Sequence, residues 1–90
     1  MSDQIIDAAA AQGLHAYAAR IYPKVGWIIM RDQAEYPDEF VARLVNTSPT
    51  PYILLADSIL ALHAQLPIGL VRSERQPTDP PEVVEVWFAT

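Results

Sequence analysis

The sequence predicts an α+β fold: a small antiparallel sheet of three to five strands with the helices packed on one face. Two observations carry this prediction. Alanine-rich helix formers fill the first quarter of the chain, and short apolar runs separated by proline-marked turns follow them. The expected element order is α-β-β-β-α-(β)-β, and the short loops between the first three strands favour antiparallel pairing.

The first predicted helix covers residues 3–21. Its apolar stripe is spaced by three or four residues, as one helix face requires, and holds Ile6, Ala10, Gly13, Tyr17 and Ile21. Gly13 costs about 1 kcal/mol against alanine inside a helix, so two shorter helices that meet there are the alternative. Pro23 ends the segment, because the residue before a proline is pushed out of the helical region.

Three predicted strands follow, over residues 27–31, 40–45 and 52–56. The polar segment between the first two contains Pro37, whose fixed backbone angle suits a turn. Both faces of 40–45 are largely apolar, which indicates a strand covered on at least one side. The loop 46–51 contains two prolines, which cannot donate to a sheet ladder.

The second predicted helix runs over 59–66. Asp57 or Ser58 can accept hydrogen bonds from its first free amides, and the helix stops before Pro67. A strand over 70–74 is left open, 76–81 is loop by composition, and 83–88 is a clear strand. We expect a single domain over 1–90, with an N-terminal helical segment at 1–25 and a sheet-and-helix core at 26–88.

Composition excludes several function classes. Eleven acidic and six basic side chains give a net charge of -5, which repels nucleic acid and anionic membrane surfaces. Cysteine is absent, so disulfides and thiolate chemistry are excluded. The acidic start of the chain does not resemble a secretory signal, and no apolar run is long enough to span a membrane. A cytoplasmic location is the resulting expectation.

Histidine offers the chain's only side chains for acid–base work near neutral pH. We expect His15 at an exposed position on the alanine-rich helix. His63 lies at the edge of the second helix's apolar face and is the weak catalytic candidate, although no triad or metal motif accompanies it. Arg72 and Arg75 are weak ligand-binding candidates, because forked donors can clamp a carboxylate or phosphate. No metal site or cofactor is predicted.

The last strand supplies the predicted subunit contact. If its alternate apolar residues face the core, then Trp87 points outward with Val83 and Glu85, and an outward tryptophan suggests an interface. A short and apolar chain also favours a two-fold homodimer. The acidic turn that holds Asp32, Glu35, Asp38 and Glu39 is a possible second surface for a basic protein partner.

The chain resembles a group of short bacterial proteins with no assigned activity. The resemblance covers about residues 27–88 and rests on Trp27, Tyr36-Pro37, Phe40-Val41-Ala42-Arg43, Ala56-Asp57-Ser58, Leu66-Pro67, Gly69-Leu70 and Val84-Glu85-Val86-Trp87. A weaker similarity is to HicB-type antitoxin domains, which implies a small basic toxin as partner. Those antitoxins typically add a DNA-binding segment after the last strand, and this sequence ends two residues after Phe88.

These observations predict a small non-enzymatic interaction or regulatory module. Two alternatives stay open. One is a HicB-like antitoxin domain, and the other is a small enzyme or ligand-binding protein with a pocket between subunits that uses His63 with Arg72 or Arg75.

Overall fold

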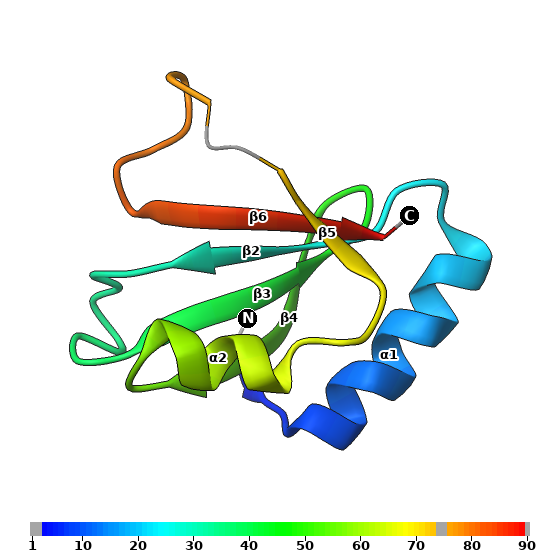
Figure 1. Ribbon diagram of the computed structural model, residues 1–90, viewed down its shortest axis with the longest axis horizontal. Helices are drawn as coiled ribbons and strands as arrows, with labels where there is room; N and C mark the ends of the chain where they lie inside the picture. The colour runs from blue at the N-terminus through cyan, green and yellow to red at the C-terminus, as the bar shows by residue number, and fades with distance from the viewer. Residues whose placement is uncertain (1–2, 74–75, 90) are drawn as a thin grey trace.

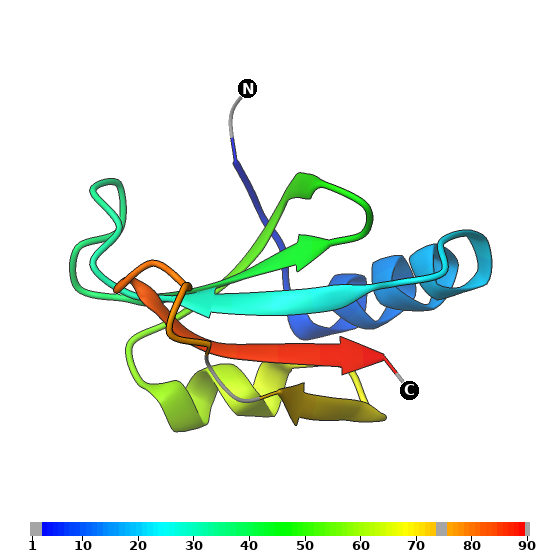
Figure 2. The ribbon, with the colours of Figure 1, turned by 90° about the horizontal axis from the view of Figure 1, so that it is seen from above.

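The computed structural model describes residues 3–73 and 76–89, and these form a two-layer α+β fold (Figures 1 and 2). The elements in chain order are β1 (Gln4–Ile5), α1 (Ala8–Ile21), β2 (Gly26–Met30), β3 (Phe40–Val45), β4 (Pro49–Ala56), α2 (Ile59–Gln65), β5 (Leu70–Ser73) and β6 (Val83–Ala89). The predicted α+β class is confirmed, but the element order differs from the prediction because the short strand β1 precedes α1. The strand left open at 70–74 is present as β5 over Leu70–Ser73, and residue 74 lies outside the described residues.

The described strands form one six-stranded sheet in the order β1-β4-β3-β2-β6-β5. All neighbouring pairs are antiparallel except β1 with β4, which is parallel. The prediction of a purely antiparallel sheet of at most five strands is therefore corrected by one short strand. Residues 3–5 were expected to be helical, but Gln4 and Ile5 pair with Tyr52 and Ile53 instead.

Asp7 sets the true start of α1. Its carboxylate accepts a hydrogen bond from the Ala10 amide at 2.8 Å, so the helix begins at Ala8. The helix runs through Gly13 without a break and ends at Ile21, two residues before Pro23. At α2 the predicted cap is confirmed, because the Ser58 hydroxyl accepts from the Ala61 amide at 3.1 Å.

Strand β4 begins three residues earlier than predicted, because its prolines lie where no β1 residue pairs with them. Pro49 opens the strand, and β1 pairs with β4 only at Tyr52 and Ile53. The first residues of β4 therefore have no neighbouring strand on that side to require their amides. A register shift opposite Val45 separates this part of the strand from the regular ladder.

Both helices cover the same face of the sheet, and the core lies between the two layers (Figure 2). The helices contribute Ala11, Ala18 and Leu62, and the sheet contributes Trp27, Ile29, Ala42, Leu44, Leu54 and Ala56. The prediction of helices on one face is confirmed. No helix within the described ranges is long and apolar enough to cross a membrane.

Candidate interaction surface

Neither α1 nor α2 covers the other face of the sheet, and apolar side chains dominate this helix-free face. Side chains alternate along a strand, so the neighbours of buried Trp27 and Ile29 point to the opposite side. The pairing register aligns them in three rows: Phe88, Gly26, Val45 and Pro49; then Val86, Ile28, Arg43 and Ile53; then Val83, Met30, Val41 and Leu55. A sheet face in water normally carries polar residues. Other parts of the chain already bury Ile53, Val41 and Val83, which are 0%, 1% and 7% exposed, so the apolar surface that remains open lies toward β6 and β5.

The helix-free face contains a hollow of about 370 Å³. Its walls are mainly apolar and consist of Ile28, Met30, Val45, Pro49, Pro80, Val83 and Val86, with Gln33, Arg43 and Asp79 as the polar members. At the edge of the same face, Phe88 is 39% exposed and Val71, its partner across β5 and β6, is 55% exposed. Apolar surface therefore continues beyond the hollow.

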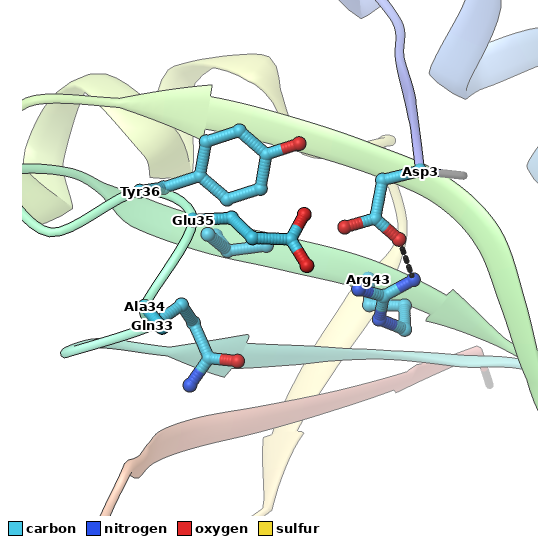
Figure 3. A pocket seen from close by; sticks show the side chains of 7 residues that line it. Asp3, Gln33, Ala34, Glu35, Tyr36 and Arg43 are labelled. Carbon is cyan, nitrogen blue, oxygen red and sulfur yellow. Dashed lines mark hydrogen bonds and ion pairs between the residues drawn. The ribbon is translucent and has the colours of Figure 1, made fainter. Parts of the chain in front are cut away.

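A smaller recess of about 190 Å³ lies beside loop 31–39 (Figure 3). In Figure 3 the Tyr36 hydroxyl and the Glu35 carboxylate lie near Asp3. Burial raises the pKa of the Tyr36 hydroxyl, and the charges of Asp3, Glu35 and Glu39 raise it further against the opposing effect of Arg43. The charged side chains that line the recess are Asp3, Glu35 and Arg43, so acids outnumber bases there.

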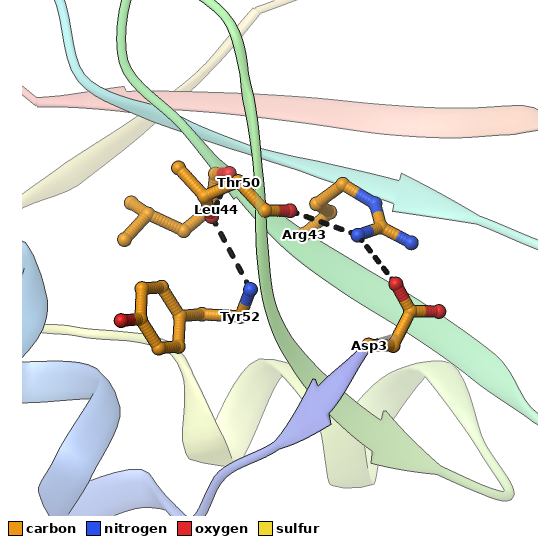
Figure 4. A network of polar contacts seen from close by, with 5 residues as sticks. All are labelled: Asp3, Arg43, Leu44, Thr50 and Tyr52. Atoms are coloured by element: carbon orange, nitrogen blue, oxygen red, sulfur yellow. Dashed lines mark hydrogen bonds and ion pairs between the residues drawn. The ribbon is translucent and has the colours of Figure 1, made fainter. Parts of the chain in front are cut away.

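Arg43 is the charged member of the three rows, and its charge is matched within the chain (Figure 4). Its Nη1 donates to Oδ1 of Asp3 at 2.9 Å and to the carbonyl of Thr50 at 2.8 Å. The two charged side chains are only 24% and 17% exposed. The pair joins the start of the chain to β3 and removes the net charge from the centre of the helix-free face.

The start of β4 is held beside Arg43 by the Thr50 hydroxyl. This hydroxyl donates to the carbonyl of Leu44 at 2.7 Å and accepts from the Tyr52 amide at 3.3 Å (Figure 4). The prolines on both sides of Thr50 have no amide hydrogen to donate, so the hydroxyl supplies the hydrogen bond to the Leu44 carbonyl. The irregular start of β4 therefore places the Thr50 carbonyl within hydrogen-bond distance of Arg43.

Acidic and basic side chains gather at opposite ends of the sheet, as measured along the strand direction. Loop 31–39 and the start of β6 share one end of the sheet (Figures 1 and 2). Among the described residues, this acidic end carries Asp32, Glu35, Asp38, Glu39, Asp79 and Glu82, with Asp57 just after β4, against Arg31. The opposite end holds exposed Arg20 and Lys24 around the connection from α1 to β2, and segments 20–25 and 46–50 contain no acid. We call these the acidic end and the basic end.

On the helix-covered face, Glu85 joins the sheet to α2. Its Oε1 lies 2.6 Å from Nε2 of His63 and accepts from the indole of Trp87 at 3.0 Å. Its Oε2 accepts from Arg72 at 3.2 Å. The rings of His63 and Trp87 also meet edge to face at 5.4 Å. Glu85 is 13% exposed, so these contacts satisfy a mostly buried carboxylate.

Two opposing effects set the pKa of Glu85. Burial is the largest single influence and raises the pKa. The hydrogen bonds from His63 and Trp87, the charge of His63 and the hydrogen bond from Arg72 together outweigh it. The pKa of Glu85 therefore lies below its usual value, and the group is ionised near neutral pH.

The structure brings two of the predicted site residues together. His63 and Arg72 both bind Glu85, which was predicted to lie at a subunit contact. Arg75 lies outside the described residues. Within the described chain, His63 and Arg72 share Glu85 as their polar partner. Such a network of side-chain hydrogen bonds is typical of a structural contact, here between α2 and the sheet.

The predicted outward orientation of Trp87 is wrong. Trp87 pairs with buried Trp27 and packs against the core, and Glu85 lies on the same side. Val83 alone of the three lies on the helix-free face, where it pairs with Met30. A register shift between Ile29 and Met30 breaks the simple alternation along β6, which explains why Val83 does not share a face with Glu85 and Trp87.

His15 was expected to be exposed, and this is also corrected. It is 6% exposed, and its Nδ1 accepts a hydrogen bond from the indole of Trp27 at 3.2 Å. Burial lowers the pKa of His15. The acids of the predicted second surface remain at the acidic end, and no cluster of metal-ligating side chains occurs in ranges 3–73 and 76–89.

The pairing of Arg43 with Asp3 was not predicted from the sequence. The available signal was a lone arginine among apolar residues on one face of the strand at 40–45. Its partner could not be found by spacing, because Asp3 lies forty residues away and reaches Arg43 through the unpredicted parallel strand β1.

The fold and surface together define the class: a two-layer α+β protein with one helix-free apolar sheet face. Comparison of the chain with protein-family models, with curated proteins and with solved structures finds no match.

Proposed function

We propose that this protein is a non-enzymatic protein-interaction module and that the helix-free face of its sheet binds another polypeptide. The observation that carries the proposal is the composition of this face, on which three cross-strand rows are apolar except for a neutralised Arg43. Burying the exposed part of this surface releases about 25 cal/mol for each Å² of apolar area. Because Arg43 is already paired with Asp3, a partner can bury this face without leaving an unpaired charge in the interface.

The extent of the surface favours a polypeptide over a small molecule. Ligand sites bury most of a small ligand in one enclosed volume. Here the apolar surface extends past the hollow to Phe88 and Val71, at the edge of the sheet. A standard protein interface takes roughly 800 Å² from each partner, which suits a whole sheet face better than a single pocket.

The alternative of a small enzyme or ligand-binding protein would use His63 with Arg72. Both carboxylate oxygens of Glu85 are engaged by side chains of the same chain. This arrangement supports a role in fixing α2 to the sheet, and the interaction module therefore remains the proposal.

Site-specific photo-crosslinking in living cells tests the proposed function. Replacing Val71 with a photoreactive phenylalanine derivative places the probe on the helix-free face, and Leu60, which is 76% exposed on α2, supplies the matched control. A discrete protein adduct from position 71, lost when Val86→Lys is added and absent from position 60, is expected. Equal labelling at both positions, or no adduct, would contradict the proposal.

A small basic protein is the partner that the antitoxin hypothesis predicts. The acidic end beside the hollow suits such a partner, because opposite charges speed association and fix orientation. The mass of the adduct separates this hypothesis from other partners.

A further inference from the structure

We propose that the partner on the helix-free face is a second copy of this chain, with its strands reversed about a two-fold axis that lies between the two sheets and perpendicular to the strands. This inference rests on the proposed function, because it names the occupant of the same surface. The two faces would form a sandwich with a spacing of about 10 Å between the sheets.

Charge complementarity selects this arrangement. Each copy has its acidic end at loop 31–39 and its basic end at the connection from α1 to β2 (Figure 1). A two-fold axis along the strands would place the two acidic ends together. An axis perpendicular to the strands reverses one copy, so that the acidic end of each lies over the basic end of the other.

The same rotation places β2 of one copy over β2 of the other. Lys24 lies two residues before β2, and Asp32 lies two residues after it. Lys24 of each copy therefore comes over the start of loop 31–39 in the other, near Asp32 and Glu35. A two-fold axis gives every such contact twice.

Shape supports the reversed packing as well. Phe88 projects from the basic end of β6, where it is 39% exposed and covers Gly26. Val83, at the opposite end of β6, lines the hollow with Met30 and Pro80. Reversal places Phe88 of one copy over the hollow beside Val83 of the other, so that an aromatic side chain fills the space that faces it.

Sedimentation equilibrium of the purified chain tests this inference, with circular dichroism to verify folding of each variant. The wild type is expected to form dimers, and Val86→Lys or Val71→Lys is expected to raise the dimer Kd by at least about tenfold, while Leu60→Lys leaves it unchanged. Val71 is 55% exposed, so its variant keeps the test valid if Val86→Lys fails to fold.

A charge swap tests the orientation. Lys24→Glu and Glu35→Lys should each weaken the dimer, and the variant that carries both should regain most of the wild-type affinity, because each copy then offers the reversed pair. Two weakened single variants without recovery in the double variant would overturn the reversed arrangement.

The oligomeric state of the purified chain and the crosslinking result from position 71 together distinguish a second copy from another protein as the partner. A monomeric chain at about 1 mM overturns the second copy as partner. If position 71 then crosslinks to a different protein in cells, the interaction module stands with another partner. A monomer without any adduct contradicts both.

Discussion

The indole Nε1 of Trp27 donates a hydrogen bond to Nδ1 of His15, 3.2 Å away in the core between α1 and β2. Both residues are buried, at 0% and 6% exposure. An imidazole that accepts at Nδ1 in this way is neutral, with its proton on Nε2. Burial favours the same neutral form and lowers the pKa of His15 from 6.5.

Stability should therefore fall as the pH falls from 7 to 5. The unfolded chain takes up a proton on His15 near pH 6.5, whereas the native chain resists it. The contribution is fully present above the unfolded pKa and is lost as the pH falls toward the folded pKa. The slope from one group is at most about 1.4 kcal/mol for each pH unit.

Urea unfolding at several pH values measures this effect in the wild type and in His15→Gln, which keeps a side-chain acceptor but does not titrate. The variant is expected to show a flatter dependence between pH 7 and pH 5. If the free energy of unfolding depends on pH equally in both proteins, protonation of His15 does not cause the loss of stability.

Substitution by alanine at Gly26 and at Gly13 should change the stability of the protein in opposite directions. A Cβ at Gly26 would lie 2.8 Å from the carbonyl oxygen of Trp87 and from Cδ1 of Phe88, so Gly26→Ala forces the strands apart. A loss of about 1 to 3 kcal/mol is expected, as for overpacking elsewhere. At Gly13, in the middle of α1, nothing lies within 4 Å of the added carbon.

Gly13→Ala is therefore expected to stabilise the protein by roughly 0.5 to 1 kcal/mol, through the higher helix propensity of alanine. Thermal or urea unfolding of both variants checks the pair. A loss of stability in Gly13→Ala would contradict the expectation that helix propensity decides the effect at this open position.

The sequence predicted those elements that local chemistry determines. Ser58 before an apolar run and Pro67 after it specify α2, and the apolar run at 52–56 specifies the regular part of β4. The extra strand β1 escaped prediction because two residues carry no periodicity of their own. Its pairing with β4 depends on a contact across nearly fifty residues.

The faces of β6 were harder to predict than its existence. Sequence patterns assign apolar residues to the core and polar residues to water. Here Glu85 lies on the helix-covered side, because His63 reaches it from α2, while apolar Val86 and Phe88 lie on the helix-free side. Only the tertiary arrangement of α2 and β5 reveals both departures from the rule.

Removing the acceptor at Glu85 should cost much more than removing an exposed acid. Glu85→Ala leaves the donors of His63, Trp87 and Arg72 without their shared partner, and a loss of about 2 to 3 kcal/mol is expected. Asp32→Asn is the matched control, because its contact with Arg31 is 3.7 Å long and exposed. That variant should change stability by less than about 0.5 kcal/mol.

Urea unfolding at pH 7 measures both losses. Near-ultraviolet circular dichroism should also report the change at Trp87, whose indole loses its acceptor in Glu85→Ala. Equal and small effects of the two variants would show that the contacts of Glu85 do not hold α2 to the sheet.

Asp3 and Arg43 should be coupled energetically although they lie at opposite ends of the first half of the chain. Their side chains are 17% and 24% exposed, and the bond between them is 2.9 Å long. A double-mutant cycle with Asp3→Asn and Arg43→Gln is expected to give a coupling energy of about 1 to 2 kcal/mol, because a largely shielded ion pair is screened little by water. Each single variant leaves one charge uncompensated on an apolar face, so the double variant should be more stable than the sum of the two losses predicts. A coupling energy near zero would mean that β1 stays on β4 through its ladder alone and that the charge of Arg43 is not held by Asp3.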